Sequence, residues 1–328
     1  MLPAPQKQLL GQREWVDSTD ASPNNDGLRE LIERADAGYP DPLDGVRFAS
    51  TAAVRLLWTD EGLAVEAQTS QSGMGKGKGT GTGDAPAILE CLTQGDTLPD
   101  ATGAGSVQTT SIDVGALGEL IGSNSVPGWN GILHLADERS GNRAFRLRNG
   151  AKLPPGGLVI ATPNTLYIQG DYNAAPAPGG REPEPAAVVA DSVVLLSPAW
   201  EDGRSDTGSS ASSMTVRAGI VSGTPPEAAS VTPSDLLRRV EDWSVSQMTL
   251  NGSLLGLYPA SETGMTSGEQ ADAPQQFTIL HDPEFLATPP GNPLVVVSLW
   301  KRPAGHEQIN GDSGPVAAMP AKPGNGHP

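Results

Sequence analysis

Residues 156–171, with the sequence GGLVIATPNTLYIQGD, decide the fold. They contain two short β-rich runs, residues 158–162 and 166–170. In the second run Leu166 and Ile168 alternate with Tyr167 and Gln169, the two-residue period of a strand. Residues of the kind that favour corners bound both runs: Gly156-Gly157, Pro163-Asn164 and Gly170-Asp171. In stacked parallel coils, inward positions repeat as aliphatic residues and corners take Gly, Asn and Asp. The stretch therefore predicts one coil of a parallel β-helix.

The same character extends in both directions, from about residue 106 to 258. Further β-rich runs follow one another with turn residues between them, at residues 107–114, 131–136, 144–147, 187–196, 216–221 and 248–257. The run at 187–196 is apolar on both faces except at Asp191-Ser192, which indicates a central strand covered on both sides. We therefore expect a mainly β protein whose principal domain is a short right-handed parallel β-helix at residues 106–258.

The rest of the chain divides into three regions. Residues 1–105 predict a small N-terminal α/β region, with an amphipathic helix at 28–36, a hairpin of residues 53–58 and 63–67, and a Gly-rich flexible loop at 73–84. Residues 259–302 form a C-terminal extension with an apolar run at 294–300, and residues 303–328 a disordered tail. Within the β-helix domain, residues 232–243 carry a helix N-cap pattern and one apolar face, so we expect a helix that caps the open end of the coil.

Charge and composition exclude several classes of function. The formal net charge is −17 and the sequence pI is about 4.5, so the negative field disfavours nucleic acid as a partner. Cys91 is the only cysteine, which rules out an internal disulfide and a thiolate metal cluster, and no cofactor motif is present. Residues 1–17 predict no signal peptide, and no run approaches the roughly 20 apolar residues of a membrane span.

One longer segment is more specific than composition. It comprises NGILHL at residues 130–135 and RAFRLRNGAKLPPGGLVIATPNTLYIQGDYN at 143–173, followed by AAVVADSVVLLSPAW at 186–200, VRAGIVSG at 216–223, EDW at 241–243 and TLNGSL at 249–254. In this order the chain resembles large bacterial surface proteins that are often linked to type IV pilus assembly. The resemblance implies a non-enzymatic structural or adhesive β-solenoid-like module in an extracytoplasmic place, at the cell surface or in the periplasm. Its implied partners are pilus or envelope proteins, or surface glycans. Relatives usually carry an N-terminal pilin-like hydrophobic segment, and residues 1–17 show none.

Two other functions remain open from the residues themselves. A β-helix enzyme that cleaves polysaccharides would use acidic residues on one face, and the candidates are Asp171, Asp191 and either Asp202 or Glu201. Asp191 interrupts an apolar strand, so burial would leave it either hydrogen-bonded at a corner or with a shifted pKa. A glycan-binding module would instead stack sugars on Trp200, Tyr167 and Tyr172. Because corner residues and core aromatics are the commoner roles, we expect a structural protein.

Overall fold

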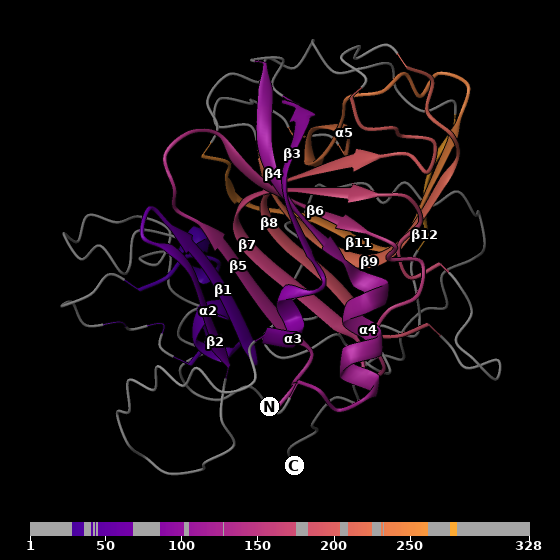
Figure 1. Ribbon diagram of the computed structural model, residues 1–328. Coiled ribbons are helices and arrows are strands. Elements are labelled where there is room, and N and C mark those ends of the chain that lie inside the picture. Colours follow the sequence, from indigo (N-terminus) through magenta and orange to yellow (C-terminus); the bar gives the residue numbers. More distant parts are fainter. Residues whose placement is uncertain are drawn as a thin grey trace, which may run out of the picture. The chain divides into compact units, whose positions relative to one another are not determined.

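The computed structural model describes residues 28–35, 41, 43, 45–67, 86–101, 105–126, 128–174, 183–203, 209–224, 231, 233–261 and 276–280. These residues form a mainly β structure (Figure 1), as predicted. Their strands belong to one mixed sheet: β1 Val54–Thr59, β2 Gly62–Ala67, β3 Leu92–Pro99, β4 Ser106–Asp113, β5 Ile132–Asp137, β6 Arg143–Arg148, β7 Leu158–Gln169, β8 Ala186–Leu196, β9 Met214–Thr224, β10 Leu237–Arg239, β11 Gln247–Pro259 and β12 Gln276–Leu280. The helical elements are short: the 3-10 helix η2 Leu28–Leu31, α2 Phe48–Thr51, α3 Pro86–Leu89, α4 Val114–Gly122 and α5 Pro233–Leu236.

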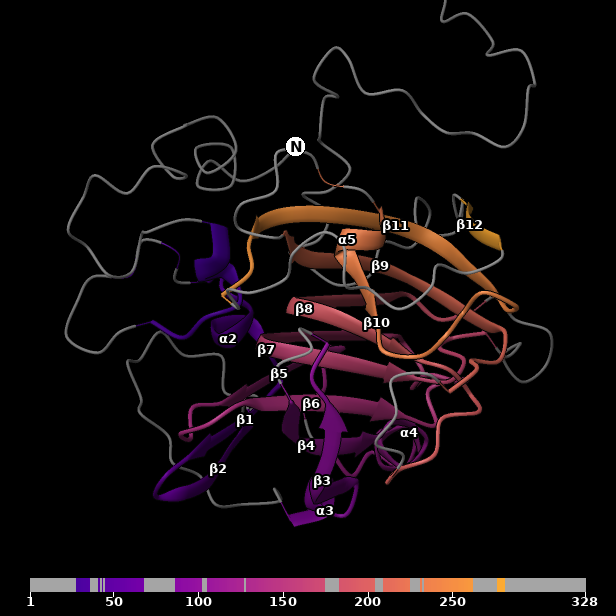
Figure 2. The same cartoon turned by 90° about the horizontal axis from the view of Figure 1, so that it is seen from above.

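Parallel pairing in sequence order dominates the sheet. Strands β1, β5, β7, β8, β9, β11 and β12 follow one another as parallel neighbours. Figure 2 shows β1, β5, β7, β8 and β9 one behind another between β2 and β11. At one end the series closes with antiparallel strands, β2 on β1 and β3 on β4. The expected hairpin of β1 and β2 is thus confirmed.

The long strands β7 and β8 bend, and the two halves of each pair with different strands. The first half of β7 pairs with β5, whereas its second half pairs with β6. Its register against β8 shifts between Thr162 and Thr165, at the predicted corner Pro163-Asn164. Strand β8 repeats this arrangement, since its first half pairs with β9 and its second half with β10. Two runs that the sequence predicts as separate strands therefore form the continuous strand β7.

Side chains at the bends connect one strand level to the next. The Asn164 amide donates to the Asp137 carbonyl at 3.0 Å and accepts from the Asp137 N–H at 2.9 Å. Asn173, in the left-handed region with φ 53°, donates to the carbonyls of Glu184 and Arg217. Gly157 has φ +97°, and a Cβ there would lie 2.3 Å from the Pro185 carbonyl oxygen. Stacking at this bend therefore requires glycine.

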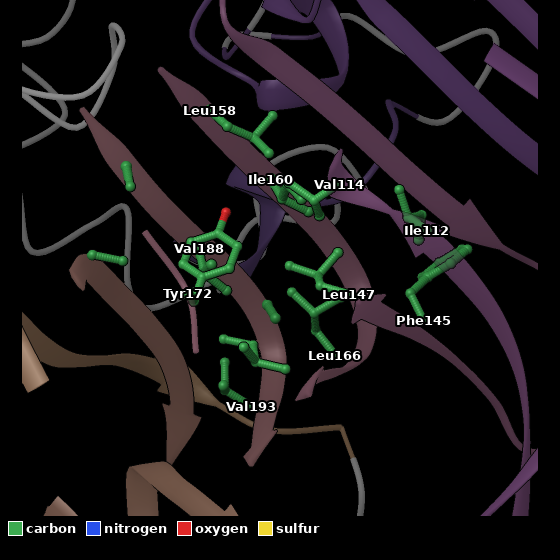
Figure 3. Close-up of a cluster of buried hydrophobic side chains, with 14 of the residues drawn as sticks. Ile112, Val114, Phe145, Leu147, Leu158, Ile160, Leu166, Tyr172, Val188 and Val193 are labelled. Carbon is green, nitrogen blue, oxygen red and sulfur yellow. The ribbon is translucent and has the colours of Figure 1, made fainter. Parts of the chain in front are cut away.

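The inner core lies between the strands that pair with the first halves of β7 and β8 and those that pair with their second halves. Side chains from both halves of β7 and β8 point toward one another and toward β4, β6 and Tyr172 (Figure 3). All positions of β8 are buried, which confirms that it is a central strand covered on both faces. We call this group the inner cluster; it includes Ile160, Leu166, Val188, Val193 and Ile220.

A second cluster lies on the opposite face of the parallel strands β5, β7, β8, β9 and β11. Leu28 and Ile32 from the N-terminal segment and Phe48 from α2 pack on alternate residues of the parallel strands, among them Val159, Val189, Val221 and Tyr258. The segment is also tied by polar contacts, because the His134 Nε2–H donates to the Ile32 carbonyl at 2.8 Å. Residues 28–35 and 48–52 are referred to below as the N-terminal cover.

The predicted capping helix at 232–243 is wrong beyond its first turn. Helix α5 ends at Leu236, and Leu237–Arg239 form β10 instead, paired in parallel with β8. Leu236, Leu237, Val240 and Trp243 are nevertheless buried. The apolar residues were correctly identified as buried, but pairing with a central strand outweighed the local helical pattern.

Two other helix predictions also change. At residues 28–36 the structure has only the 3-10 helix Leu28–Leu31. Helix α4 was not predicted, because Gly115 and Gly118 weaken its pattern; Asp113 caps it by accepting from the Ala116 N–H at 2.9 Å.

The described residues all belong to one compact unit. The expected boundaries at residues 105 and 258 do not interrupt the sheet, since β1 pairs with β5 and β3 with β4 across the first, and β11 pairs with β12 across the second. The expected Gly-rich loop at 73–84, the apolar run at 294–300 and the tail at 303–328 lie outside the described residues. Among the described residues, no helix is long and apolar enough to cross a membrane.

Candidate functional site

Asp191 is buried at the bend of β8, with 1% of its surface exposed. It accepts hydrogen bonds from the Ser261 N–H at 2.8 Å and from the Ser261 hydroxyl at 2.9 Å. It also forms an ion pair with Arg29, whose guanidinium donates in addition to the Pro163 carbonyl. Asp191 thus joins the N-terminal cover, the bend of β7 and the end of β11.

Asp171 lies at the exposed corner after β7. Its carboxylate accepts from the Thr215 N–H at 2.7 Å, at the start of β9. Gly170, with φ +77°, turns the chain at this point. The residue therefore satisfies a strand-end donor, which is the corner role that Asp commonly has.

Asp202 belongs to a network around the buried side chain of Arg146 on β6. The Arg146 Nη1 donates to Asp202 Oδ1 at 2.5 Å, and Nη2 donates to Asp202 Oδ2 at 3.1 Å and to Asp96 Oδ2 at 2.6 Å. Its Nε donates to the Ser111 hydroxyl, which itself donates to Asp96. Trp200 completes the network, because its indole N–H donates to Asp202 at 3.2 Å.

In this network the candidate acid Asp202 shares the partner Arg146 with a second carboxylate, Asp96. Both aspartate oxygens contact Arg146 Nη2, so they lie within about 6 Å of each other, close to the roughly 5–5.5 Å of retaining glycosidases. Chemically, however, Asp202 is unsuited to act as the general acid of such a pair. The hydrogen bond from Arg146 is the main reason that the pKa of Asp202 lies below its usual range, so this carboxyl stays ionised. A general acid needs a raised pKa instead.

The predicted acids do not assemble into one site. Asp191 contacts Arg29 and Ser261, Asp171 contacts Thr215, and Asp202 contacts Arg146. Glu201 is exposed. Asp96 and Arg146 were not predicted. The signal for Arg146 is an arginine between Phe145 and Leu147 in a buried strand, which calls for carboxylate partners, but sequence spacing alone does not identify them.

The aromatic residues proposed for glycan stacking are all buried. Tyr167 is 1% exposed and its hydroxyl donates to the Pro99 carbonyl at 2.8 Å. Tyr172 lies in the inner cluster, and Trp200 packs with Tyr167 and Val194. None of the three presents an open ring face.

Among the described residues, no group of three or more His, Cys, Asp or Glu side chains is placed to hold a metal ion. Comparisons with family models, curated proteins and solved structures find no match to this chain. The functional argument therefore depends on the geometry of its own side chains.

Proposed function

We propose that this chain is a non-enzymatic structural module, displayed outside the cytoplasm, whose parallel strands are successive coils of a short right-handed β-helix. The observation that carries the proposal is that each aspartate expected to act as a catalytic acid is instead an anchor between distant segments. Asp191 connects the N-terminal cover to the end of β11, and Asp171 connects a corner to β9. Asp202 holds a buried arginine.

The stacking of the strands supports the coil architecture. The long strands β7 and β8 bend so that their two halves pair with different strands. Strand β8, which follows β7 in the sequence, lies parallel beside it along both halves. Asn164 and Asn173 use their amides to join the backbone of adjacent levels at the bends. Such bridges satisfy corner donors and acceptors that lie beyond the strand ladders. Right-handed connections are the rule for parallel strands, which favours that hand.

The proposed location outside the cytoplasm rests on the resemblance of residues 130–254 to bacterial surface proteins. The proposed association with pilus or envelope proteins has the same basis. The acidic charge of −17 suits an exposed, soluble module. Adding protease to intact host cells tests the location. Digestion of the chain while a cytoplasmic marker survives supports the proposal, and protection of the chain until lysis overturns it.

A polysaccharide-cleaving enzyme is the second candidate, and the spacing of Asp96 and Asp202 favours it. Neutral and acidic polysaccharides incubated with the purified chain distinguish the two functions, with new reducing ends and unsaturated products as the readouts. We expect no turnover above that of Asp202→Asn. We also expect Asp202→Asn to unfold at a lower temperature than the wild type, because the buried Arg146 loses one of the two carboxylates that neutralise it.

Asp171→Asn is the matched control, since it changes an exposed corner acid that lies outside the Arg146 network. Cleavage by the wild type that disappears in Asp202→Asn, with both variants folded, would overturn the structural proposal.

A further inference from the structure

The second half of β11 has a strand partner on one edge only in the described part of the chain. Its first half lies between β9 and β12, whereas residues 253–256 pair with β9 alone. The β9 residues 220–222, which face residues 254–256 and lie between β8 and β11, are buried. Leu254, Leu255 and Leu257 of β11 remain half-buried. An apolar strand edge of this kind is a surface to which another strand can add.

The exposed edge is apolar on both faces. Leu254 packs against the inner cluster, and Leu255 and Leu257 pack against the second cluster, which lies on the opposite face. A strand added beside them would place alternate residues over both clusters. Its sequence must therefore be apolar throughout and cannot alternate with polar residues.

We infer that residues 294–298, with the sequence LVVVS, dock in parallel along the second half of β11 and form the next level of the stack. This inference rests on the coil architecture proposed above. The chain order supports this occupant, because β12 already pairs with the first half of β11 and residues 294–298 come next in the sequence.

The length of the connection agrees with an example inside the fold. Tyr172 bridges to the first half of β9, and β8 then pairs with the second half of β9 after the connection 173–185. Between β12 and residue 294 the connection 281–293 has the same length. Pro185 directly precedes β8, and Pro293 directly precedes residue 294. A connection of this length therefore already joins a segment beside the first half of one long strand, β9, to a strand beside its second half.

Disulfide trapping in the full-length chain tests the inference. Leu255→Cys is combined in turn with Val295→Cys, Val296→Cys and Val297→Cys, and mild oxidation is followed by peptide mapping. Facing residues on neighbouring parallel strands lie about 4.8 Å apart, within disulfide reach. Because alternate side chains of a strand point to opposite faces, we expect an intramolecular bond at Val296 alone, or at Val295 and Val297 without Val296. The native thiol should not interfere, because burial, with a contribution from Asp113, raises the pKa of Cys91 to about 11.

Two control pairs separate the possible failures. Thr215→Cys with Thr249→Cys joins direct partners of β9 and β11 and should cross-link. Its failure would reject the stacked architecture itself. Val245→Cys with Val296→Cys should not cross-link, because Val245 lies in the turn before β11, and the strand from Gln247 to Leu255 alone extends roughly 26 Å. With the first control positive, three results would overturn the docking alone: no bond with Leu255→Cys, equal bonds at all three positions, or disulfide-linked dimers that identify a second copy as the occupant.

Discussion

At the scale of single residues, buried charge is used to join parts of the chain that are far apart in sequence. Asp191 lies in an otherwise apolar strand and contacts Arg29 and Ser261. A buried carboxylate is stable only when hydrogen bonds and an opposite charge replace its water. The same rule applies to Arg146, whose three nitrogens all have partners on other segments.

Replacing Asp191 should therefore weaken the whole fold. Asp191→Asn keeps the size of the side chain but removes the buried one of the two carboxylates that pair with the Arg29 guanidinium, the other being Glu33. We expect the free energy of unfolding to fall by about 3 kcal/mol in urea titrations. Asp171→Asn, at an exposed corner, should cost less than about 1 kcal/mol. Equal losses for the two variants would contradict the anchoring role of Asp191.

His134 gives stability a dependence on pH. Burial is the main cause that lowers the pKa of His134 to about 4, and the nearby Arg55 and Arg34 lower it further, although its bond to the Ile32 carbonyl opposes them. The unfolded chain takes up a proton below its ordinary pKa of about 6.5, whereas the folded chain does not until about pH 4. This contribution to stability is therefore complete above pH 6.5 and is lost as the pH falls toward 4.

His134→Gln removes the titrating group and retains a donor for the Ile32 carbonyl. Between pH 7 and pH 5 the wild type should lose about 2 kcal/mol more stability than the variant, measured as the difference between their urea unfolding curves. The comparison cancels the titration of the many carboxylates that both proteins share. Parallel pH profiles for the two proteins would show that His134 is not buried in its neutral form.

At the scale of elements, sequence patterns predicted strands better than helices. Residues 187–196 were predicted to be a central strand because both faces are apolar, and β8 is buried along its whole length. Residues 232–243 were predicted to be a helix from a cap and one apolar face, yet β10 forms there because β8 offers it a parallel partner. A local pattern cannot reveal a partner that lies about 40 residues away in the chain.

The candidate site shows the same limit. The sequence identified Asp191 as unusual, because a carboxylate in an apolar strand needs a partner. It could not identify Arg29, which lies 162 positions earlier. The connection between Asp96 and Asp202 was missed for the same reason, since it exists only through Arg146. Corner residues were predictable because the conformational preferences of Gly and Asn are local.

At the scale of the whole molecule, the described strands behave as one unit that spans the expected domain boundaries. The series of parallel strands includes β1 from the N-terminal region, which pairs with β5. The N-terminal cover packs across β7, β8, β9 and β11. The ends of the stack differ, because antiparallel strands close one end and the half-buried leucines of β11 lie at the other. In such an arrangement each strand is stabilised by the neighbours with which it pairs.

Amide hydrogen exchange along the full chain tests this central claim most directly. The slowest exchange should occur in β7 and β8, with β1 and residues 28–35 protected in the same cooperative unit, and faster exchange in the edge strands β2, β3 and β12. If residues before 105 open independently of β7 and β8, or if β8 exchanges as fast as β2, the single stacked unit is contradicted.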